Sequence, residues 1–269
     1  MNKKILILTV TAIMAVTLLS GCNAKASGTS DNSLSDIKKK GEFVIGLDDS
    51  FPPMGFKDDK GNIVGFDIDL ANEAAKRMGV KAVFKPSAWD GILMSLNNKD
   101  IDLIWNGLTI TDDRKKQIDF SKVYLQNKQI IVVKSDSSIS TKKGLSGKIV
   151  ALQLGSSSET ALSADSVTAK SVKEIRKFDD NTQALMDLQA GRVDAVVVDE
   201  VVGRYYMSKK IGVYKVLDED FGKESYGVGI RKSDQTFKAE LDKTLDAMKA
   251  DGTEDKISEK WFGKAIITK

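Results

Sequence analysis

Arg114 is the residue of this sequence whose type and position most clearly suggest chemistry. It follows two aspartates in what reads as the first turn of a helix, where the helix dipole favours anions and mildly disfavours a cation. A guanidinium is a planar fork that can bind a carboxylate through two parallel hydrogen bonds. Two interpretations are open. Arg114 either binds an anion from outside the chain, or pairs locally with Asp112, Asp113 or Asp119.

The position of Arg114 favours a site at the end of a strand. Residues 101–105 form an apolar run typical of a buried strand, and Thr111 is the expected N-cap of the helix that follows. Ligands of open α/β sheets bind outside the carboxyl ends of the strands. Gly107 and Thr109 lie just past such an end and are therefore candidate ligand contacts.

A second strand end, near the N-terminus, carries a carboxylate and an aromatic residue. Residues 43–47 read as a buried strand, and Asp48 and Phe51 follow it in a turn that two prolines stiffen. Such residues are commonly ordinary members of a surface loop, but here they occupy the same kind of position as Gly107. Trp89 lies in a further loop, after the next expected helix and strand.

Helices that alternate with short apolar strands predict an α/β layer structure with parallel strands. The clearest helix covers residues 65–79, with acidic residues in its first turn, basic residues in its last turn and a terminal glycine. Residues 80–85 predict the following strand. Near the C-terminus, residues 235–251 predict an amphipathic helix, and a final short helix is expected to end at residues 260–263.

An internal repeat suggests that this construction occurs twice. Residues 94–105 align without gaps with residues 186–197, and both segments read as a helix end, a polar turn and the Ile/Val-Asp start of a buried strand. The alignment places Gly107 opposite Asp199. The alternative is a chance match of two generic units. If the match is not due to chance, the repeat predicts two similar lobes whose strand-end loops face a shared cleft.

The second lobe also offers polar groups at a strand end. Residues 148–152 read as a strand, and residues 155–159 read as a turn that starts a helix. Gln153, Ser156 and Ser157 lie at this junction and are added to the candidate ligand contacts.

Two segments are expected to connect the lobes. Residues 123–133 form a strand-like run long enough to leave one lobe and enter the other, and residues 226–230 offer a strand where the chain could cross back. We therefore expect one lobe to consist of residues 34–125 plus 228–269, and the other to consist of residues 126–227.

The N-terminus carries the features of an export signal. Two lysines precede an uncharged apolar stretch over residues 5–19, which is too short for a comfortable transmembrane helix, and Leu-Ser-Gly-Cys follows. This sequence resembles a lipobox. We expect a signal peptide over residues 1–21, lipid attachment at Cys22 and a flexible polar tether over residues 22–33. Because Cys22 is the only cysteine, an intramolecular disulfide is excluded.

Composition argues against several functions. The 269 residues, 41% of them apolar, can bury one large core or two modest ones. The formal net charge is +3 and there is no basic block, which argues against nucleic-acid binding. There is no histidine, which excludes His-based triads and the commonest zinc sites, and we expect no metal and no cofactor.

Together the candidate residues could recognise a zwitterion. Arg114 could bind a carboxylate, with Thr109 and the backbone N–H groups of the turn at residues 156–157 as further donors. Asp199 could accept hydrogen bonds from an ammonium, and the Gly107 carbonyl could share it. These are the two charged groups of a free α-amino acid.

The remaining candidates would surround the side chain of such a ligand. Phe51 and Trp89 would flank it, and Asp48 would bind a donor at its far end. These residues favour arginine, lysine, histidine or glutamine, and a guanidinium stacked between two aromatic rings would favour a basic ligand.

Several motifs span nearly the whole processed chain. They are Asp48-x-x-Phe51-Pro-Pro, Gly65-Phe-Asp-Ile-Asp-Leu70, Gly107-Leu-Thr-Ile-Thr-x-x-Arg114, Asp119-Phe-Ser121, Gly155-Ser-Ser-Ser-Glu159, Asp199-Glu200 and Trp261-Phe-Gly263. In this order they resemble the extracytoplasmic solute-binding proteins of amino-acid ABC importers, the polar amino acid group.

This resemblance implies a type II periplasmic-binding-protein-like α/β fold, with two hinge strands and a ligand cleft between two lobes. In similar proteins the residue matching Arg114 binds the α-carboxylate and the one matching Asp199 binds the α-ammonium. The residue matching Phe51 covers the side chain, and the one matching Asp48 often reads its end. The sequence departs from the pattern in the serines after Gly155, where relatives often carry Gly-Thr. A second departure is a valine before Asp199, where some relatives carry a polar residue.

The sequence thus predicts the substrate-binding component of an ABC importer. We expect a monomer outside the cytoplasm that meets the membrane only through its lipid and delivers a polar or basic L-amino acid to the permease. The rivals are an enzyme on the same fold, a dehydratase or lyase that recruits Glu159 or Glu200, and a ligand-sensing domain. A sensor would need a transmembrane segment and a cytoplasmic output domain.

Overall fold

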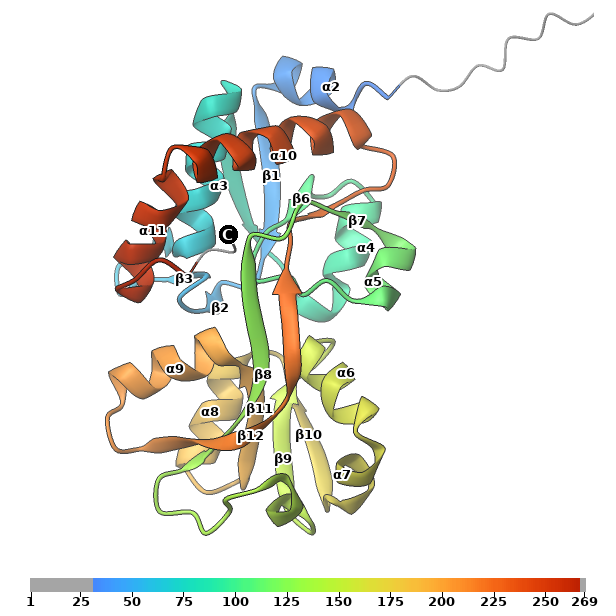
Figure 1. Cartoon of the computed structure of the whole chain (residues 1–269). Coiled ribbons are helices and arrows are strands. Elements are labelled where there is room, and N and C mark those ends of the chain that lie inside the picture. Colours follow the sequence, from blue (N-terminus) through green and yellow to red (C-terminus); the bar gives the residue numbers. More distant parts are fainter. Residues whose placement is uncertain (1–30, 267–269) are drawn as a thin grey trace, which may run out of the picture. The chain divides into compact units, whose positions relative to one another are not determined.

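A computed structural model describes residues 31–266 of the chain (Figure 1). Its strands are β1 (Glu42–Leu47), β2 (Ser50–Phe51), β3 (Gly55–Lys57), β4 (Ile63–Val64), β5 (Lys81–Pro86), β6 (Leu103–Ile104), β7 (Asp119–Phe120), β8 (Leu125–Lys134), β9 (Ile149–Gln153), β10 (Glu174–Phe178), β11 (Ala195–Asp199), β12 (Tyr214–Tyr226) and β13 (Gly229–Ile230). Its helices are α2 (Ser33–Lys40), α3 (Phe66–Met78), α4 (Ile92–Asn97), α5 (Asp112–Gln117), α6 (Ser157–Ala164), α7 (Ser166–Ser171), α8 (Asn181–Gln189), α9 (Glu200–Lys209), α10 (Gln235–Ala250) and α11 (Thr253–Phe262), with short 3-10 turns η1 (Trp89–Gly91) and η2 (Lys142–Leu145).

Two five-stranded sheets organise these elements. The first has the order β5-β1-β6-β13-β7 and the second the order β10-β9-β11-β8-β12, while β2, β3 and β4 form a small sheet of their own. β1 pairs in parallel with β5 and β6, and β9 pairs in parallel with β10 and β11. Each large sheet therefore contains the parallel βαβ units that the alternation of helices and strands predicts, and the α/β class is confirmed.

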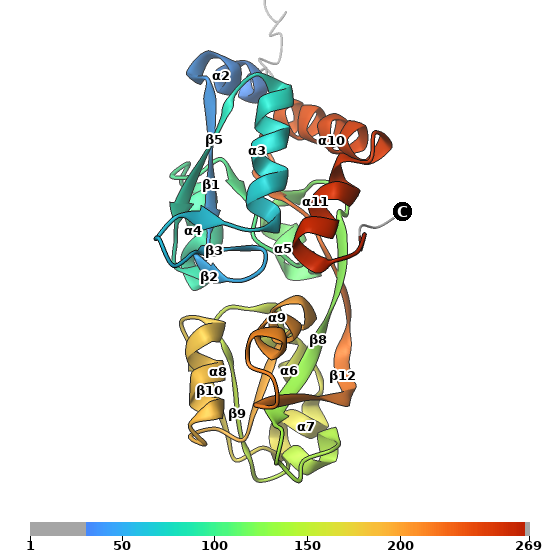
Figure 2. The ribbon, with the colours of Figure 1, turned by 90° about the vertical axis from the view of Figure 1, so that its left-hand side faces the viewer.

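Helices cover both faces of each large sheet (Figures 1 and 2). In the first, the buried residues of α2, α3 and α10 pack on one face, and those of α4 pack on the other. In the second, α8 and α9 pack on one face and α6 on the other. Buried strands with helices on both faces carry near-continuous apolar runs, which is why residues 43–47 and 195–198 were recognisable in the sequence.

The internal repeat is present in the structure down to its turn. Lys99 and Gly191, which the alignment matches, have φ angles of 66° and 73°, in the left-handed region. Asp102 and Asp194, also matched, each accept the backbone N–H of the neighbouring parallel strand, at 2.9 and 2.8 Å. Both units therefore close the helix with the same turn and hold the next strand with the same carboxylate, so the alignment is not a chance match.

Two long antiparallel strands connect the large sheets (Figure 1). β8 follows β7 of the first sheet, and β12 returns the chain towards β13, with partners from Tyr214↔Lys134 to Tyr226↔Leu125. The outgoing strand is where the sequence predicts it. The returning strand is not residues 226–230, because β12 already ends at Tyr226. Its middle is charged and interrupted by two register shifts, so it lacks the alternation that marks a strand in a sequence.

The N-terminal predictions fall mostly outside the described residues. The signal peptide and Cys22 lie in the part that the structure does not describe. Ser33, the last residue of the expected tether, is the first residue of α2. Within residues 31–266, no helix is both long enough and apolar enough to span a bilayer.

Candidate functional site

The strand-end loops of the two large sheets meet through side-chain contacts. Thr109 Oγ1, beyond β6, lies 3.0 Å from Ser157 Oγ at the start of α6. Gln153 Nε2, at the end of β9, donates to Asp48 Oδ2 beyond β1, at 2.7 Å. All four side chains are buried. The structure therefore brings together candidates that the sequence placed in different lobes.

Arg114 has no carboxylate partner within residues 31–266. Its Nη1 donates to the Thr109 carbonyl at 2.9 Å, and its Nη2 donates to the Gly155 carbonyl at 3.3 Å. The two aspartates of its own helix pair with the lysines that follow it, and Asp119 accepts from Gln235. The interpretation of a local ion pair is therefore wrong.

The electrostatic surroundings of Arg114 fit an anion site. Burial lowers the pKa of the guanidinium, and the carboxylates of Glu224 and Asp199 act in the opposite direction. Its Cζ also lies 5.9 Å from the centre of the Trp89 ring. A partly buried cation that contacts only neutral carbonyl oxygens can gain a charge-assisted pair from an incoming carboxylate.

The predicted turn at the start of α6 is present, but the hydroxyls of its first two serines have different hydrogen-bond partners. Ser156 is the N-cap: its Oγ accepts from the Glu159 N–H at 3.3 Å and donates to the Gln153 carbonyl at 2.7 Å. Ser157 Oγ is instead contacted by Thr109 and by Gln129 Nε2, which lies 3.1 Å away. The Ser157 hydroxyl therefore lies within the constellation, whereas the Ser156 hydroxyl is engaged in the helix cap.

Asp199 lies in a cluster of polar side chains from the two connecting strands. Its buried Oδ1 accepts from Asn127 Nδ2, Gln129 Nε2 and Tyr226 Oη, at 2.7, 2.9 and 2.6 Å. Glu224 Oε1 lies 2.6 and 2.9 Å from the same two amide nitrogens. Burial, and then the charge of Glu224, raise the pKa of Asp199 well above its ordinary value.

Sequence reasoning missed these four companions of Asp199. The signal available for them is their spacing, because side chains two residues apart on a strand point to the same face. Residues 127 and 129 on β8 are such a pair, and so are residues 224 and 226 on β12. Each pair could have been found only if the polar strand around it had been recognised.

Aromatic side chains form the next part of the site. The rings of Phe51 and Trp89 are parallel within 4°, with centroids 6.5 Å apart. Gly107, with φ of 62°, packs against two rings: a Cβ there would lie 2.8 Å from Phe51 and 3.2 Å from Tyr226. The glycine thus supplies both the left-handed turn and the room for the rings.

An aspartate that sequence reasoning read as a helix-end charge supports this turn from behind. Asp67 is fully buried, and its Oδ2 accepts the Gly107 N–H at 2.7 Å and the Tyr124 Oη at 3.0 Å. Burial raises its pKa to about 7. Asp67 therefore positions the Gly107 turn.

Asp48 lies just beyond β1, and three neighbouring donors bind its carboxylate. Its Oδ1 accepts from the N–H and hydroxyl of Ser50, at 2.9 and 2.6 Å, and its Oδ2 accepts from Gln153. Burial raises its pKa. A cavity of about 380 Å³ adjoins it. The lining residues are Asp48, Asp49, Ser50, Pro86, Ser87, Ala88, Trp89, Asp179 and Asp180.

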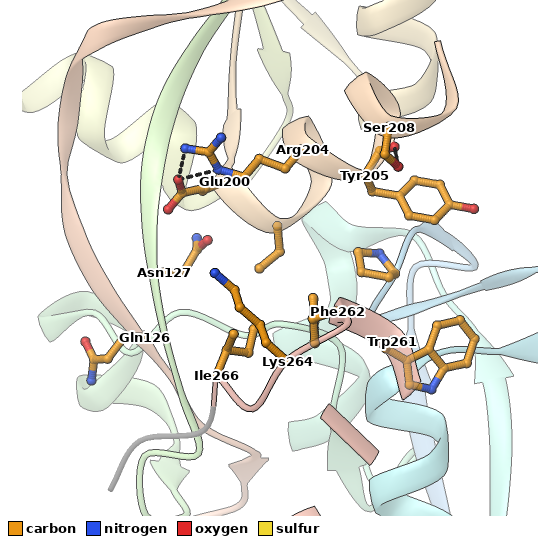
Figure 3. A pocket seen from close by; sticks show the side chains of 12 residues that line it. Gln126, Asn127, Glu200, Arg204, Tyr205, Ser208, Trp261, Phe262, Lys264 and Ile266 are labelled. Atoms are coloured by element: carbon orange, nitrogen blue, oxygen red, sulfur yellow. Dashed lines mark hydrogen bonds and ion pairs between the residues drawn. The ribbon is translucent and has the colours of Figure 1, made fainter. Parts of the chain in front are cut away.

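A second cavity, of about 370 Å³, lies among residues of β8, α9 and the C-terminal segment (Figure 3). Arg204 pairs with Glu200 at its wall, and Lys264 comes from the segment after α11. Asn127 also lines it, and the Oδ1 of this buried amide has no hydrogen-bond partner within the described residues. This cavity therefore borders the Asp199 cluster through one side chain.

Metal binding has no support in the described part of the chain. Within residues 31–266, no group of three or more histidine, cysteine, aspartate or glutamate side chains could hold an ion.

Comparisons with known proteins agree with this geometry. The model of bacterial extracellular solute-binding proteins, family 3, matches residues 43–264. The L-cystine-binding protein TcyJ of Escherichia coli K12 is 36% identical, over 96% of this chain and 95% of that protein. The lysine/arginine/ornithine-binding periplasmic protein of the same organism is 35% identical, over 93% and 96%.

A solved structure extends the likeness to three dimensions. A substrate-binding protein of an ABC uptake transporter from Streptococcus pneumoniae, with bound histidine, matches with a TM-score of 0.86 at 34% identity, over 90% of this chain and 100% of that one. The two-lobed binding-protein fold is thereby confirmed. The chain belongs to the bacterial extracellular solute-binding proteins of family 3.

Proposed function

We propose that this solute-binding protein captures a basic L-amino acid and delivers it to an ABC permease. One observation carries the proposal: on either side of Thr109 lie the Arg114 guanidinium, which has no carboxylate partner among the described residues, and the carboxylates of buried Asp199 and half-buried Glu224. The carbonyl of Thr109 accepts from Arg114, and its hydroxyl lies 2.9 Å from Glu224 Oε1. A free amino acid carries the two complementary charges on groups bonded to the same carbon, so its head group fits this arrangement.

Each charge of the ligand would have its own partners. Arg114 would bind the α-carboxylate, with the hydroxyls of Thr109 and Ser157 beside it. Asp199 would bind the α-ammonium, and the Gly107 carbonyl would share it. Desolvated ion pairs of this kind contribute strongly to the binding free energy, because each charge is hydrogen-bonded as well as neutralised.

The side-chain end supports a ligand with a cationic tip. Phe51 and Trp89 offer ring faces to a guanidinium or ammonium. Asp48 is an acceptor, and three further aspartates line the adjoining cavity. Lys57 pairs with Asp49, which leaves a net negative charge around the cavity. Arginine and lysine match this charge, whereas histidine and glutamine would match the hydrogen-bonding pattern alone.

L-Cystine is the second candidate, and a relative favours it. TcyJ is similar over nearly the full length of both chains. Cystine carries a second ammonium that Asp48 could bind, but it also carries a second carboxylate. Within the described residues, the cavity beyond Asp48 is lined by acidic and neutral side chains, which disfavours that carboxylate.

Isothermal titration calorimetry of ligand-stripped protein tests the proposal directly. Arginine and lysine should bind most tightly in a panel that includes histidine, glutamine, glutamate and cystine. Tightest binding of cystine would select the second candidate. The absence of saturable heat with every amino acid would refute amino-acid capture.

An enzyme on the same fold is the remaining alternative, and two contacts speak against it. Glu159 Oε1 pairs with Lys177 at 2.6 Å, and Glu200 Oε1 pairs with Arg204 at 2.6 Å. Both carboxylates proposed as a recruited acid or base are thus committed to ion pairs. Incubation of each bound amino acid with the protein, followed by mass spectrometry, should return it unchanged.

The proposal includes a lipid anchor and a hinge. We propose that Cys22 carries the lipid after removal of residues 1–21, and that Cys22→Ser releases the protein from membranes into the soluble extracytoplasmic fraction. Residues 34–125 plus 228–269 would close against residues 126–227 by bending of the two connecting strands, and the protein would act as a monomer. Closure is favoured because contacts to one ligand come from both lobes.

A further inference from the structure

Glu224 has a position that amino-acid capture by Asp199 alone does not explain. It lies on the connecting strand β12, and its Oε1 shares two donors with Asp199 Oδ1. Asn127 Nδ2 lies 2.6 Å from Glu224 and 2.7 Å from Asp199, and Gln129 Nε2 lies 2.9 Å from each. Both carboxylate groups are therefore gathered around the same pair of amide nitrogens.

The donors in this cluster cannot neutralise two negative charges. The two amides, Tyr226 Oη and the Thr109 hydroxyl, which lies 2.9 Å from Glu224 Oε1, are all neutral, and Gln129 Nε2 also contacts Ser157 Oγ. Two carboxylates gathered around the same neutral donors repel each other, and this repulsion favours the uptake of one proton by the pair. Burial and the neighbouring Glu224 both raise the pKa of Asp199, in keeping with this geometry.

Other charged groups nearby do not supply the missing cation. Arg114, from α5, acts on both carboxylates at a distance but has no carboxylate oxygen within 4.0 Å in the described residues. Tyr226 donates to Asp199, and Tyr124, packed beside it, donates to Asp67. Lys128, on the same strand as the amides, pairs with Glu200 and Asp220 instead, and Glu159 of α6 pairs with Lys177.

We propose that Glu224 and Asp199 share one proton in the ligand-free protein and release it when the ligand's ammonium arrives. The exchange balances in charge: the singly protonated pair carries one negative charge, and the ammonium enters as one proton leaves. The freed pair then binds the ammonium with both carboxylates. Glu224 is thus a second ammonium contact, and it links capture of the amino acid to pH. This inference rests on the proposed amino-acid binding.

Calorimetry in buffers of different ionisation enthalpy tests the exchange. The dependence of the observed heat on the buffer gives the number of protons released per ligand bound. With L-arginine as the probe, or L-cystine if only that binds, at about pH 6.5, where a free ammonium stays protonated, wild type should release about one proton. Glu224→Gln should release none. Glu219→Gln, an exposed carboxylate change on the same strand, should behave as wild type.

The pH dependence of affinity supplies a second readout that needs no variant. Because one proton competes with the ligand, Kd of wild type should rise about tenfold for each pH unit lowered below the pKa of the pair. Saturable binding without proton release, or with a Kd independent of pH between about 5 and 7, would overturn this inference and leave amino-acid capture standing. The absence of any binding would instead refute amino-acid capture, and this inference with it.

Discussion

Replacing Arg114 with alanine should weaken ligand binding much more than it lowers the stability of the fold. Within residues 31–266 the guanidinium donates only to the carbonyls of Thr109 and Gly155, at 2.9 and 3.3 Å, and it also lies over the Trp89 ring. Water can take over both contacts at the edge of the site, so the free energy of unfolding should fall by only about 1 kcal/mol. With ligand bound, the same change leaves a desolvated carboxylate without its cation, which costs about 3 kcal/mol.

The loss of about 3 kcal/mol of binding free energy converts to a large change in affinity. At 1.4 kcal/mol per factor of ten, Arg114→Ala should raise Kd by roughly 150-fold. Arg114→Lys keeps the charge but loses the planar fork, so its Kd should rise by a smaller factor, about tenfold. Calorimetry gives Kd, and urea unfolding of the ligand-free protein gives stability.

Lys115→Ala on the same helix is the matched control. Lys115 is exposed and pairs with Asp112, so its loss should change neither quantity measurably. The reasoning is refuted if Arg114→Ala binds the amino acid within about threefold of wild type, or if it unfolds so readily that binding is lost only through instability. Arg114 would then be a structural residue.

Three further changes probe the remaining parts of the site. Asp67→Asn should flatten the pH dependence of stability measured by urea unfolding. The native pKa of Asp67, about 7, lies above the ordinary 3.8, so the free energy of unfolding of wild type should fall by up to about 4 kcal/mol as pH rises from about 4 to 7, and that of the variant should not. Gly107→Ala should weaken binding more than tenfold, because its Cβ would lie 2.8 Å from Phe51, whereas Gly212→Ala, also left-handed but in open space, should bind normally in calorimetry. Asp48→Asn should weaken arginine binding at least tenfold and glutamine binding less, as competition titrations can show.

The sequence was sufficient for the parts of the fold whose signals are local. Thr111 caps α5 by accepting the Arg114 N–H, and Gly79 ends α3 in the left-handed conformation, because these positions depend on residues a few places away. The repeat of residues 94–105 at 186–197 went further, since it predicted two similar units with equivalent strand ends. Because the alignment places Asp199 opposite Gly107, that equivalence made Asp199 a candidate ligand contact.

The parts that escaped prediction depend on contacts between distant segments. β12 is stabilised as a strand by its pairing with β8 and not by an apolar pattern of its own, so Glu224 read as one charge among several. Asp67 reads as a favourable charge at a helix start, but its depth in the core is set by Gly107 and Tyr124. Such roles become visible only when the segments are placed side by side.

The side-chain end of the site shows how distant residues restrict the choice of ligand. Asn181 Nδ2 donates to Gln153 Oε1 at 3.0 Å, and this contact turns the amide so that Gln153 Nε2 donates to Asp48. Three donors occupy the Asp48 carboxylate, which leaves it one further acceptor position at the adjoining cavity, and a ligand side chain that ends in a carboxylate would meet like charge there. From Asp48 alone, the ligand group that meets it could not be identified. The chain from Asn181 through Gln153 fixes how Gln153 meets Asp48, and we therefore expect donor-tipped amino acids to bind more tightly than acidic ones.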